Sequence, residues 1–175
     1  EKAGLLTRVH GGALSLNTTR FYRPLKERMQ DQQPQKQAIA RAVVAQIPDG
    51  STLFLNSGTT THCIAAALKD RRNINVVTNS LAVAMELGKQ SLIHVLLLGG
   101  EINTQHGFTY GIDAEEQLRR YQAGWAILSV DGVSPKGGIT TYHAEEAILD
   151  RMMMDGAKKV LITADRSKIG RTGFT

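Results

Sequence analysis

The sequence has little of what marks a secreted, membrane-spanning or metal-binding protein. Its one cysteine, Cys63, excludes a disulfide within the chain and fits a reducing cytosol. No apolar run approaches the roughly 20 residues that a helix needs to span a bilayer, and we expect no signal peptide. None of the five histidines has a metal-ligand spacing to a second histidine or to Cys63. We therefore expect a cytoplasmic protein that contacts no membrane and holds no metal or cofactor.

The composition indicates one globular domain with an excess of positive charge. Of the 175 residues, 42% are hydrophobic and 21% are charged, which suits a packed core rather than a disordered chain. The formal net charge is +5 and the sequence pI is about 9.5, so an anionic partner is favoured, either nucleic acid or a phosphorylated small molecule. The basic residues are scattered, which is more typical of a solvated surface than of a nucleic-acid-binding face.

Apolar runs alternate with helical patterns from residue 36 onward. Residues 1–20 hold too little apolar sequence for a core, so we expect an arm or linker from an upstream domain, followed by a domain over 21–175. Residues 21–35 are rich in Gln and contain Pro24 and Pro34, which indicates a connecting segment. The pattern predicts strands at 52–55, 74–78, 92–98, 125–130 and 159–163, and helices at 36–47, 63–68, 81–87, 112–121 and 144–156. Such alternation predicts an α/β fold, a mostly parallel sheet with helices on both faces.

The loop that follows the first of these strands is the strongest candidate for a ligand site. Ser57, Gly58, Thr59, Thr60 and Thr61 connect the apolar run to an Ala-rich helix. A glycine turn at a helix start presents backbone N–H groups to an anion, and the hydroxyl groups add further donors. The functional hypothesis is a phosphate cradle, and the alternative is an ordinary helix N-cap, where Ser and Thr are favoured anyway. No lysine follows the glycine, so the loop is not a P-loop.

The other strands also end in polar or glycine residues. In a parallel sheet these ends share one edge, where ligands bind. Asn79 is either a ligand contact or a helix N-cap, and Gly100 either allows close approach of a ligand or makes a tight turn. Asp131 is either a hydrogen-bond acceptor for a sugar or a turn residue. Lys168 either binds a phosphate or pairs with Asp165, while Glu145 and Glu146 also suit the first turn of a helix.

These segments together resemble the DeoR-type family of bacterial transcriptional repressors. The resemblance covers nearly the whole chain in order, and it rests on Arg8-Val9-His10-Gly11-Gly12-Ala13, Asn56-Ser57-Gly58-Thr59-Thr60-Thr61, Val77-Thr78-Asn79-Ser80, Leu98-Gly99-Gly100, Asp131-Gly132 and Asp165-Arg166-Ser167-Lys168. In that family an N-terminal winged helix-turn-helix binds operator DNA, and a C-terminal domain senses a phosphorylated sugar or related metabolite. By this resemblance the chain begins at the end of the wing and stops earlier than the family usually does.

The resemblance also implies a set of contacts and a partner. Ser57 to Thr61 would bind the phosphate of the effector, and Asn79, Gly100, Asp131, Glu145 and Lys168 would line the rest of the pocket. The family's loop usually begins with Asp where this chain has Asn56, which removes one negative charge beside the phosphate. The protein would work as a homo-oligomer that binds operator DNA through the N-terminal domain.

The implied fold is Rossmann-like and doubly wound, related to ribose-5-phosphate isomerase and coenzyme A transferases, and so it supplies two enzymatic alternatives. By resemblance to the isomerases, Asp131-Gly132, Lys136-Gly137-Gly138 and Glu145 match parts of an active site. Ser134 stands where a second aspartate belongs, and the loop between Asp131 and Lys136 is short. We therefore predict a domain that binds a sugar phosphate without converting it. A coenzyme A-handling enzyme is the third hypothesis.

Overall fold

A parallel sheet is the centre of the computed structural model, which describes residues 6–9, 12–15 and 25–175. Five strands of the described chain pair in the order β11-β8-β3-β4-β5, all parallel. Their bounds are β3 (Thr52–Leu55), β4 (Ile74–Thr78), β5 (Ile93–Leu97), β8 (Ala123–Ser129) and β11 (Ala157–Thr163). The fold is therefore the predicted α/β fold with a mostly parallel sheet.

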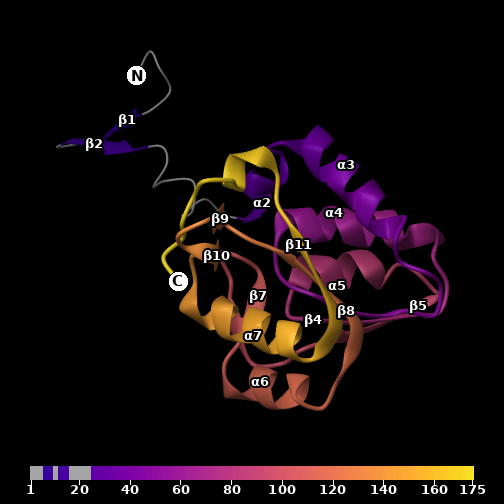
Figure 1. The fold of residues 1–175 in the computed structure, drawn as a ribbon. Helices are drawn as coiled ribbons and strands as arrows, with labels where there is room; N and C mark the ends of the chain where they lie inside the picture. Colours follow the sequence, from indigo (N-terminus) through magenta and orange to yellow (C-terminus); the bar gives the residue numbers. More distant parts are fainter. Residues whose placement is uncertain (1–5, 10–11, 16–24) are drawn as a thin grey trace.

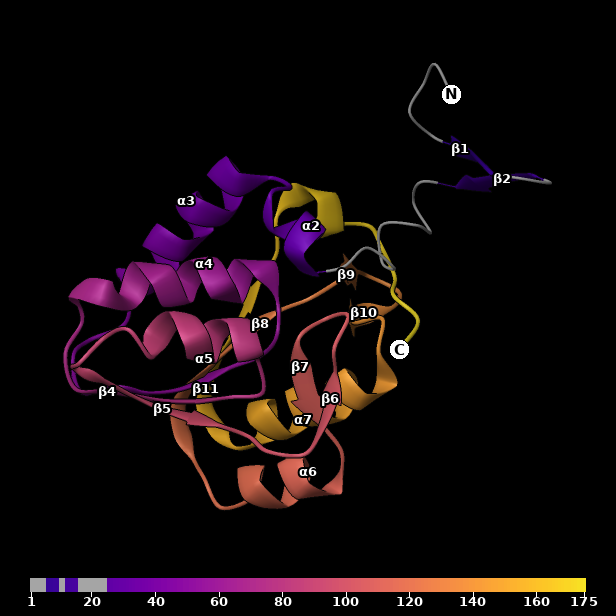
Figure 2. The ribbon, with the colours of Figure 1, turned by 180° about the vertical axis from the view of Figure 1, so that it is seen from behind.

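Helices cover both faces of this sheet (Figures 1 and 2). On one face lie α3 (Gln33–Val44), α4 (Thr59–Ala67) and α5 (Leu81–Leu87), and on the other lie α6 (Ile112–Leu118) and α7 (Ala144–Asp155). The short helix α2 (Leu25–Met29) and the 3-10 turn η2 (Arg166–Lys168) lie side by side above the carboxyl ends of the strands, and the 3-10 turn η1 (Leu68–Asp70) ends α4.

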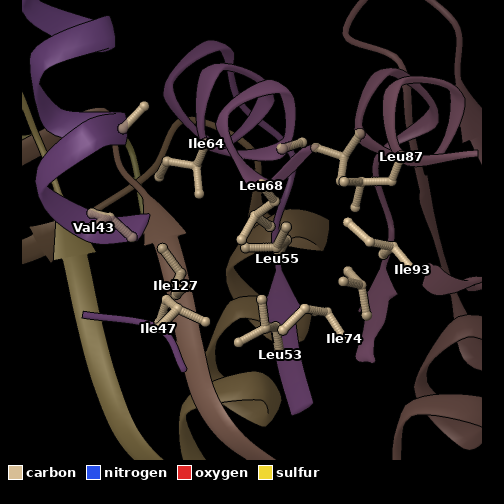
Figure 3. Close-up of a cluster of buried hydrophobic side chains, with 14 residues drawn as sticks. Val43, Ile47, Leu53, Leu55, Ile64, Leu68, Ile74, Leu87, Ile93 and Ile127 are labelled. Atoms are coloured by element: carbon tan, nitrogen blue, oxygen red, sulfur yellow. The ribbon is translucent and has the colours of Figure 1, made fainter. Parts of the chain in front are cut away.

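The sheet separates two apolar cores, because side chains along its central strands alternate between its faces. Leu53 and Leu55 of β3 pack beneath α3, α4 and α5, whereas Phe54 packs against α6 and α7. Figure 3 shows the first core, where Ile64 and Leu87 from the helices meet side chains of the strands. Burial on both faces explains why the central strands are nearly continuous apolar runs.

The edge strand β5 is less buried than its sequence suggests. An apolar run such as that at 92–98 is typical of a strand buried on both faces, but His94 is exposed and Leu97 is 39% exposed. The reason is strand order, since β5 pairs only with β4 among the described strands and the helices cover it incompletely.

Three segments for which the sequence predicts no strand or helix contain regular structure. Residues 101–110 form a hairpin of β6 (Glu101–Asn103) and β7 (Phe108–Tyr110). The Gly/Pro segment after Asp131 forms a second hairpin of β9 (Gly132–Ser134) and β10 (Gly138–Thr140). The predicted connecting segment contains α2 and the start of α3. Strands of three residues are too short for a period of two to be recognised.

The predicted N-terminal arm contains an antiparallel pair, β1 (Leu6–Val9) with β2 (Gly12–Ser15). His10 and Gly11, which carry part of the family resemblance, lie outside the described residues. The division into an arm over 1–20 and a sensor domain over 21–175 stays a prediction. Among the described helices, none has the length and apolar character required to cross a membrane.

Candidate functional site

Two cavities that share part of their lining lie where the strand order of the sheet reverses. After β3 the chain adds β4 and β5 on one side, then returns to place β8 on the other side of β3. Open α/β sheets bind ligands at such a switch point, beyond the carboxyl ends of the strands. Two adjoining cavities lie here and share Arg28, Ser129, Val130 and Asp131 in their linings. We call them the outer cavity, toward α3 and η2, and the inner cavity, toward α7.

The outer cavity is lined by cations from four separate segments. They are Arg28 of α2, Lys36 of α3, Lys168 of η2 and Arg171 beyond it. Lys36 is only 4% exposed, and its Nζ donates to the backbone carbonyl of Arg28 at 2.7 Å. Burial lowers the pKa of Lys36, although Asp31 and Asp165 favour its charged form. An ammonium has three donors, so a buried lysine beside a cavity is suited to binding an anion.

The amino end of α4 opens into the same space. Thr59 and Thr60 line the outer cavity, and Ser57 and Gly58 line the inner one. The N-cap residue Gly58 gives no side-chain hydrogen bond to the first turn, whose N–H groups have no acceptor within the helix. Thr61 is fully buried and donates to the carbonyl of Gly58 at 3.0 Å, so it fixes the turn rather than facing the cavity.

Gly58 packs closely against β8. A Cβ atom at this position would lie 2.0 Å from the Oγ of Ser129 and 3.2 Å from the Oγ1 of Thr61. The sequence predicts Gly58 as part of a phosphate cradle at the start of a helix. In the structure its missing side chain makes room first for Ser129, which itself lines both cavities.

Asp131 joins the two cavities and is held as an anion. One of its oxygens, Oδ1, lies 3.3 Å from Nη2 of Arg28 and 3.2 Å from Nζ of Lys168. Its other oxygen, Oδ2, accepts from the backbone N–H of Tyr142 at 3.2 Å. Burial by itself would raise the pKa of Asp131, but the two cations and this hydrogen bond hold it below the ordinary value. Lys168 thus forms an ion pair with Asp131.

A second carboxyl group, Glu146, faces the inner cavity and has a raised pKa. It is 8% exposed and accepts a hydrogen bond from the hydroxyl of Thr141 at 3.1 Å. Burial raises the pKa of Glu146 well above the ordinary value, and the nearby carboxylates Asp150 and Asp131 raise it further. The site therefore combines two carboxyl groups whose pKa values are shifted in opposite directions, lowered for Asp131 and raised for Glu146.

Two histidines complete the inner cavity. His106 comes from the turn between β6 and β7, and His143 precedes α7, and their ring centroids are 4.4 Å apart. Burial lowers the pKa of His106 to about 4 and lowers that of His143 as well. Within the described chain, Nδ1 of His106 and Nε2 of His143 are buried and have no hydrogen-bond partner.

Asn79 and Gly100 lie away from both cavities. They follow β4 and β5, whose ends are covered by the β6–β7 hairpin. Thr109 of that hairpin donates to the carbonyl of Leu98 at 2.7 Å, and its backbone N–H donates to the carbonyl of Asn79 at 2.8 Å. Gly100 has a φ of +127°, and a Cβ there would lie 2.4 Å from the carbonyl oxygen of Tyr110. The cavity linings therefore do not support ligand contacts for these two residues.

Glu145 and Lys136, the residues that match the isomerase pattern, are both exposed and line neither cavity. The neighbouring Glu146 faces the inner cavity instead, because the first turn of α7 directs successive side chains to different sides. Lys136 lies in the turn between β9 and β10.

The sequence analysis missed several residues that line the cavities. A signal existed for Lys36, which shares the buried stripe of α3 with Ala40 and Val43. A lysine at an apolar position of a helix is unusual and indicates a specific role. Arg28 and Arg171 carried no such signal, because their positions depend on how α2 and the segment after η2 fold over the sheet.

Among the described residues, no group of three or more histidine, cysteine, aspartate or glutamate side chains is placed to hold a metal ion.

Comparison with known proteins decides the family. The family model of the DeoR C terminal sensor domain matches residues 31–175. The chain belongs to the DeoR sensor-domain family. It is 33% identical over 170 residues to the glycerol-3-phosphate regulon repressor of Escherichia coli strain K12, covering 97% of this chain and 67% of the relative. It is 32% identical over 176 residues to a putative aga operon transcriptional repressor of Escherichia coli O157:H7, covering 99% of this chain and 65% of the relative.

The solved structures confirm the fold of this DeoR sensor domain. A D-ribose-5-phosphate isomerase in complex with phospho-erythronic acid superimposes with a TM-score of 0.58 at 15% identity, covering 78% of this chain and 54% of the isomerase. At that identity the likeness shows the fold alone. The curated relatives are named as repressors, so the prediction of a regulatory rather than an enzymatic domain is confirmed. The chain spans about two thirds of the length of these relatives.

Proposed function

We propose that this DeoR sensor domain binds a phosphorylated sugar or a closely related metabolite at the switch point of its sheet. The observation that carries the proposal is the outer cavity, where the buried Lys36, the cations Arg28 and Lys168 and the amino end of α4 converge. Positive charge from separate segments, together with a helix start, suits a phosphate dianion.

The two ends of the site differ in charge, which suits a ligand with two different ends. Four cations line the outer cavity together with the carboxyl groups of Asp31, Asp131 and Asp165, whereas the inner cavity holds Glu146, whose pKa is raised, and two histidines of lowered pKa. Asp131 lies between them and already orients Arg28 and Lys168. A phosphate would enter the outer end and sugar hydroxyl groups the inner end. Of the contacts predicted from sequence, we keep Ser57, Gly58, Thr59, Thr60, Asp131 and Lys168 in this proposed site, with Thr61 supporting the turn.

The names of the relatives support a phosphorylated polyol as the effector. One relative is a repressor of a glycerol-3-phosphate regulon, and glycerol 3-phosphate has a phosphate at one end and two hydroxyl groups at the other. In the intact protein, effector binding would shift the domain between two states with different operator affinity, as differential binding requires. Operator binding would reside in a winged helix-turn-helix preceding the arm, and the intact protein would be a homo-oligomer.

A thermal-shift series with sugar phosphates and their parent sugars tests the proposal. We expect glycerol 3-phosphate, ribose 5-phosphate or glucose 6-phosphate to raise the melting temperature, since a ligand at 100 times its Kd adds about 2.7 kcal/mol of stability. Lys36→Met should abolish the shift because it removes the buried cation. Lys136→Met, which removes an exposed lysine outside the cavities, is the matched control and should leave it unchanged. Equal shifts with a sugar and with its phosphate would contradict the proposal.

A further inference from the structure

The two histidines of the inner cavity carry polar atoms that the fold does not satisfy. Nδ1 of His106 and Nε2 of His143 are buried without a hydrogen-bond partner in the described part of the protein. Buried polar atoms are nearly always hydrogen-bonded, so an unpaired one needs an explanation such as a ligand or an ordered water. Both residues line the inner cavity, and His106 is only 4% exposed.

The positions of the two rings are fixed by packing. The ring of His143 lies 4.4 Å from His106 and 5.6 Å from Phe108, measured between centroids. The turn that carries His106 is held by Asn103, whose Oδ1 accepts from the backbone N–H of His106 at 3.0 Å. His143 is the N-cap residue of α7, yet its side chain caps nothing. The two imidazoles therefore have fixed positions beside the cavity and no structural hydrogen bond through these two nitrogens.

A third buried polar atom without a hydrogen-bond partner does not lie at a cavity. Oδ1 of Asn79 is also buried without a partner among the described residues, but Asn79 lies beneath the β6–β7 hairpin and lines neither cavity. Among the described residues, only these two histidine nitrogens are unsatisfied and belong to residues that line the inner cavity.

We propose that His106 and His143 form a hydroxyl-binding pair that recognises the polyol part of the effector while the cations of the outer cavity hold its phosphate. This inference rests on the proposed function. Neutral imidazole offers one donor and one acceptor nitrogen, and a hydroxyl group can both donate and accept. A hydroxyl group therefore satisfies either tautomer.

The groups around the inner cavity disfavour an anion at this end. Asp131 and Glu146 are both carboxyl groups, and the one Lys or Arg side chain among the described lining residues, Arg28, already pairs with Asp131 at 3.3 Å. Burial raises the pKa of Glu146, which favours the protonated form that can donate to a further hydroxyl oxygen. The pair consequently selects a neutral, hydroxylated end over a charged one.

Isothermal titration calorimetry on the whole chain tests the two ends of the site separately. One titration uses inorganic phosphate, and the other uses the sugar phosphate that stabilises the protein most. His106→Phe and His143→Phe keep an aromatic ring and remove the nitrogens. We expect each to weaken sugar-phosphate binding about tenfold, as for one lost buried hydrogen bond, and to leave inorganic phosphate binding unchanged. The melting temperature of the free protein should be equal or higher, because an unsatisfied polar atom is removed. His94→Phe, on the exposed edge strand, is the matched control.

The possible outcomes separate this inference from the proposed function. Unchanged sugar-phosphate affinity in both variants would overturn the hydroxyl-binding pair and indicate a buried water instead. Equal losses for phosphate and sugar phosphate would also overturn it, since they indicate general damage to the cavity. If the unaltered protein binds no sugar phosphate at all, the proposed function fails, and the pair fails with it.

If a histidine variant does not fold, a measurement on the unaltered protein still tests the inference. In 15N spectra of labelled histidine side chains, sugar phosphate should shift Nδ1 of His106 and Nε2 of His143, and inorganic phosphate should not. Absence of any ligand-specific shift at both nitrogens would overturn the inference.

Discussion

Asn56 shows how a single side chain joins three elements at the edge of the site. Its Nδ2 donates to both carboxylate oxygens of Asp150, at 2.9 and 3.0 Å, and to the carbonyl of Ser129 at 2.9 Å. Its Oδ1 accepts from the backbone N–H of Ser129 at 2.9 Å. The family usually has Asp at this position, which would set two carboxyl groups against each other here. In this chain Asn56 connects the end of β3 to β8 and α7, so the hydrogen bonds of its amide stabilise the fold and are not directed at a phosphate.

Asp150, the partner of Asn56, should make stability depend on pH. Burial raises the pKa of Asp150 from 3.8 to about 7, despite the hydrogen bond from Asn56. Between these two values the unfolded chain releases this proton and the folded chain keeps it, so stability falls as pH rises. The slope from one such group approaches about 1.4 kcal/mol per pH unit. We expect Asp150 to lower the free energy of unfolding from about pH 4 to about pH 7, against an opposite contribution from His106, whose pKa is lowered from 6.5 to about 4.

Urea unfolding across this pH range checks the assignment to Asp150. Asp150→Asn should remove its share of the slope, and the part due to the buried Glu146 should remain, because its pKa is raised in the same direction. Asp155→Asn, which changes an exposed carboxyl group in the last turn of the same helix, is the control and should keep the full slope. An unchanged slope in Asp150→Asn would show that Asp150 ionises normally in the folded protein.

At the scale of elements, the sequence gives good predictions where a segment is long and its pattern local. The strands at Thr52–Leu55 and Ile74–Thr78 and the helix at Leu81–Leu87 have the predicted bounds. The hairpins β6–β7 and β9–β10 were missed, because their stability comes from what they cover and not from their own pattern. His106 was missed with β6–β7, since only that turn brings it beside His143.

Thr109, at the base of the β6–β7 hairpin and outside both cavities, should contribute to stability without contacting the effector. Thr109 donates through Oγ1 to the carbonyl of Leu98 at 2.7 Å and contacts the carbonyl of Asn79 at 3.3 Å. Thr109→Val keeps the shape and leaves the buried carbonyl of Leu98 without this donor, which should cost about 1–3 kcal/mol. Denaturant unfolding measures that loss, and calorimetry on the same protein should find unchanged sugar-phosphate affinity. A large loss of affinity would indicate that the ends of β4 and β5, with Asn79 and Gly100, belong to the binding site after all.

At the scale of the whole molecule, strand order decides which loops form the cavity. The polar ends of β3, β8 and β11 line it, and those of β4 and β5 do not, because the switch point lies between β3 and β8. Sequence analysis identified all five ends and could not order them, since order depends on pairing between distant segments. For the same reason it could not tell that the apolar run of β5 lies at an edge, nor that Arg28 and Arg171 fold over the opening.

The same arrangement predicts that the domain binds sugar phosphates without converting them. Aldose–ketose isomerisation needs a base and an acid within hydrogen-bond reach of the substrate. The two residues that match the isomerase pattern, Lys136 and Glu145, are exposed and outside both cavities. A displacement of about 1 Å can already reduce a rate by on the order of 10²-fold, and these side chains face solvent altogether.

An interconversion assay with ribose 5-phosphate and hexose 6-phosphates checks this on protein whose binding has been verified by calorimetry. We expect saturation of the site and no turnover above the uncatalysed rate. Glu146 is the one glutamate that lines the inner cavity among the described residues, and its raised pKa would suit an acid. Glu146→Gln should therefore leave the background rate unchanged while it alters affinity. Turnover that disappears in Glu146→Gln and persists in Glu145→Gln would show that the cavity is an active site and that the regulatory assignment is incomplete.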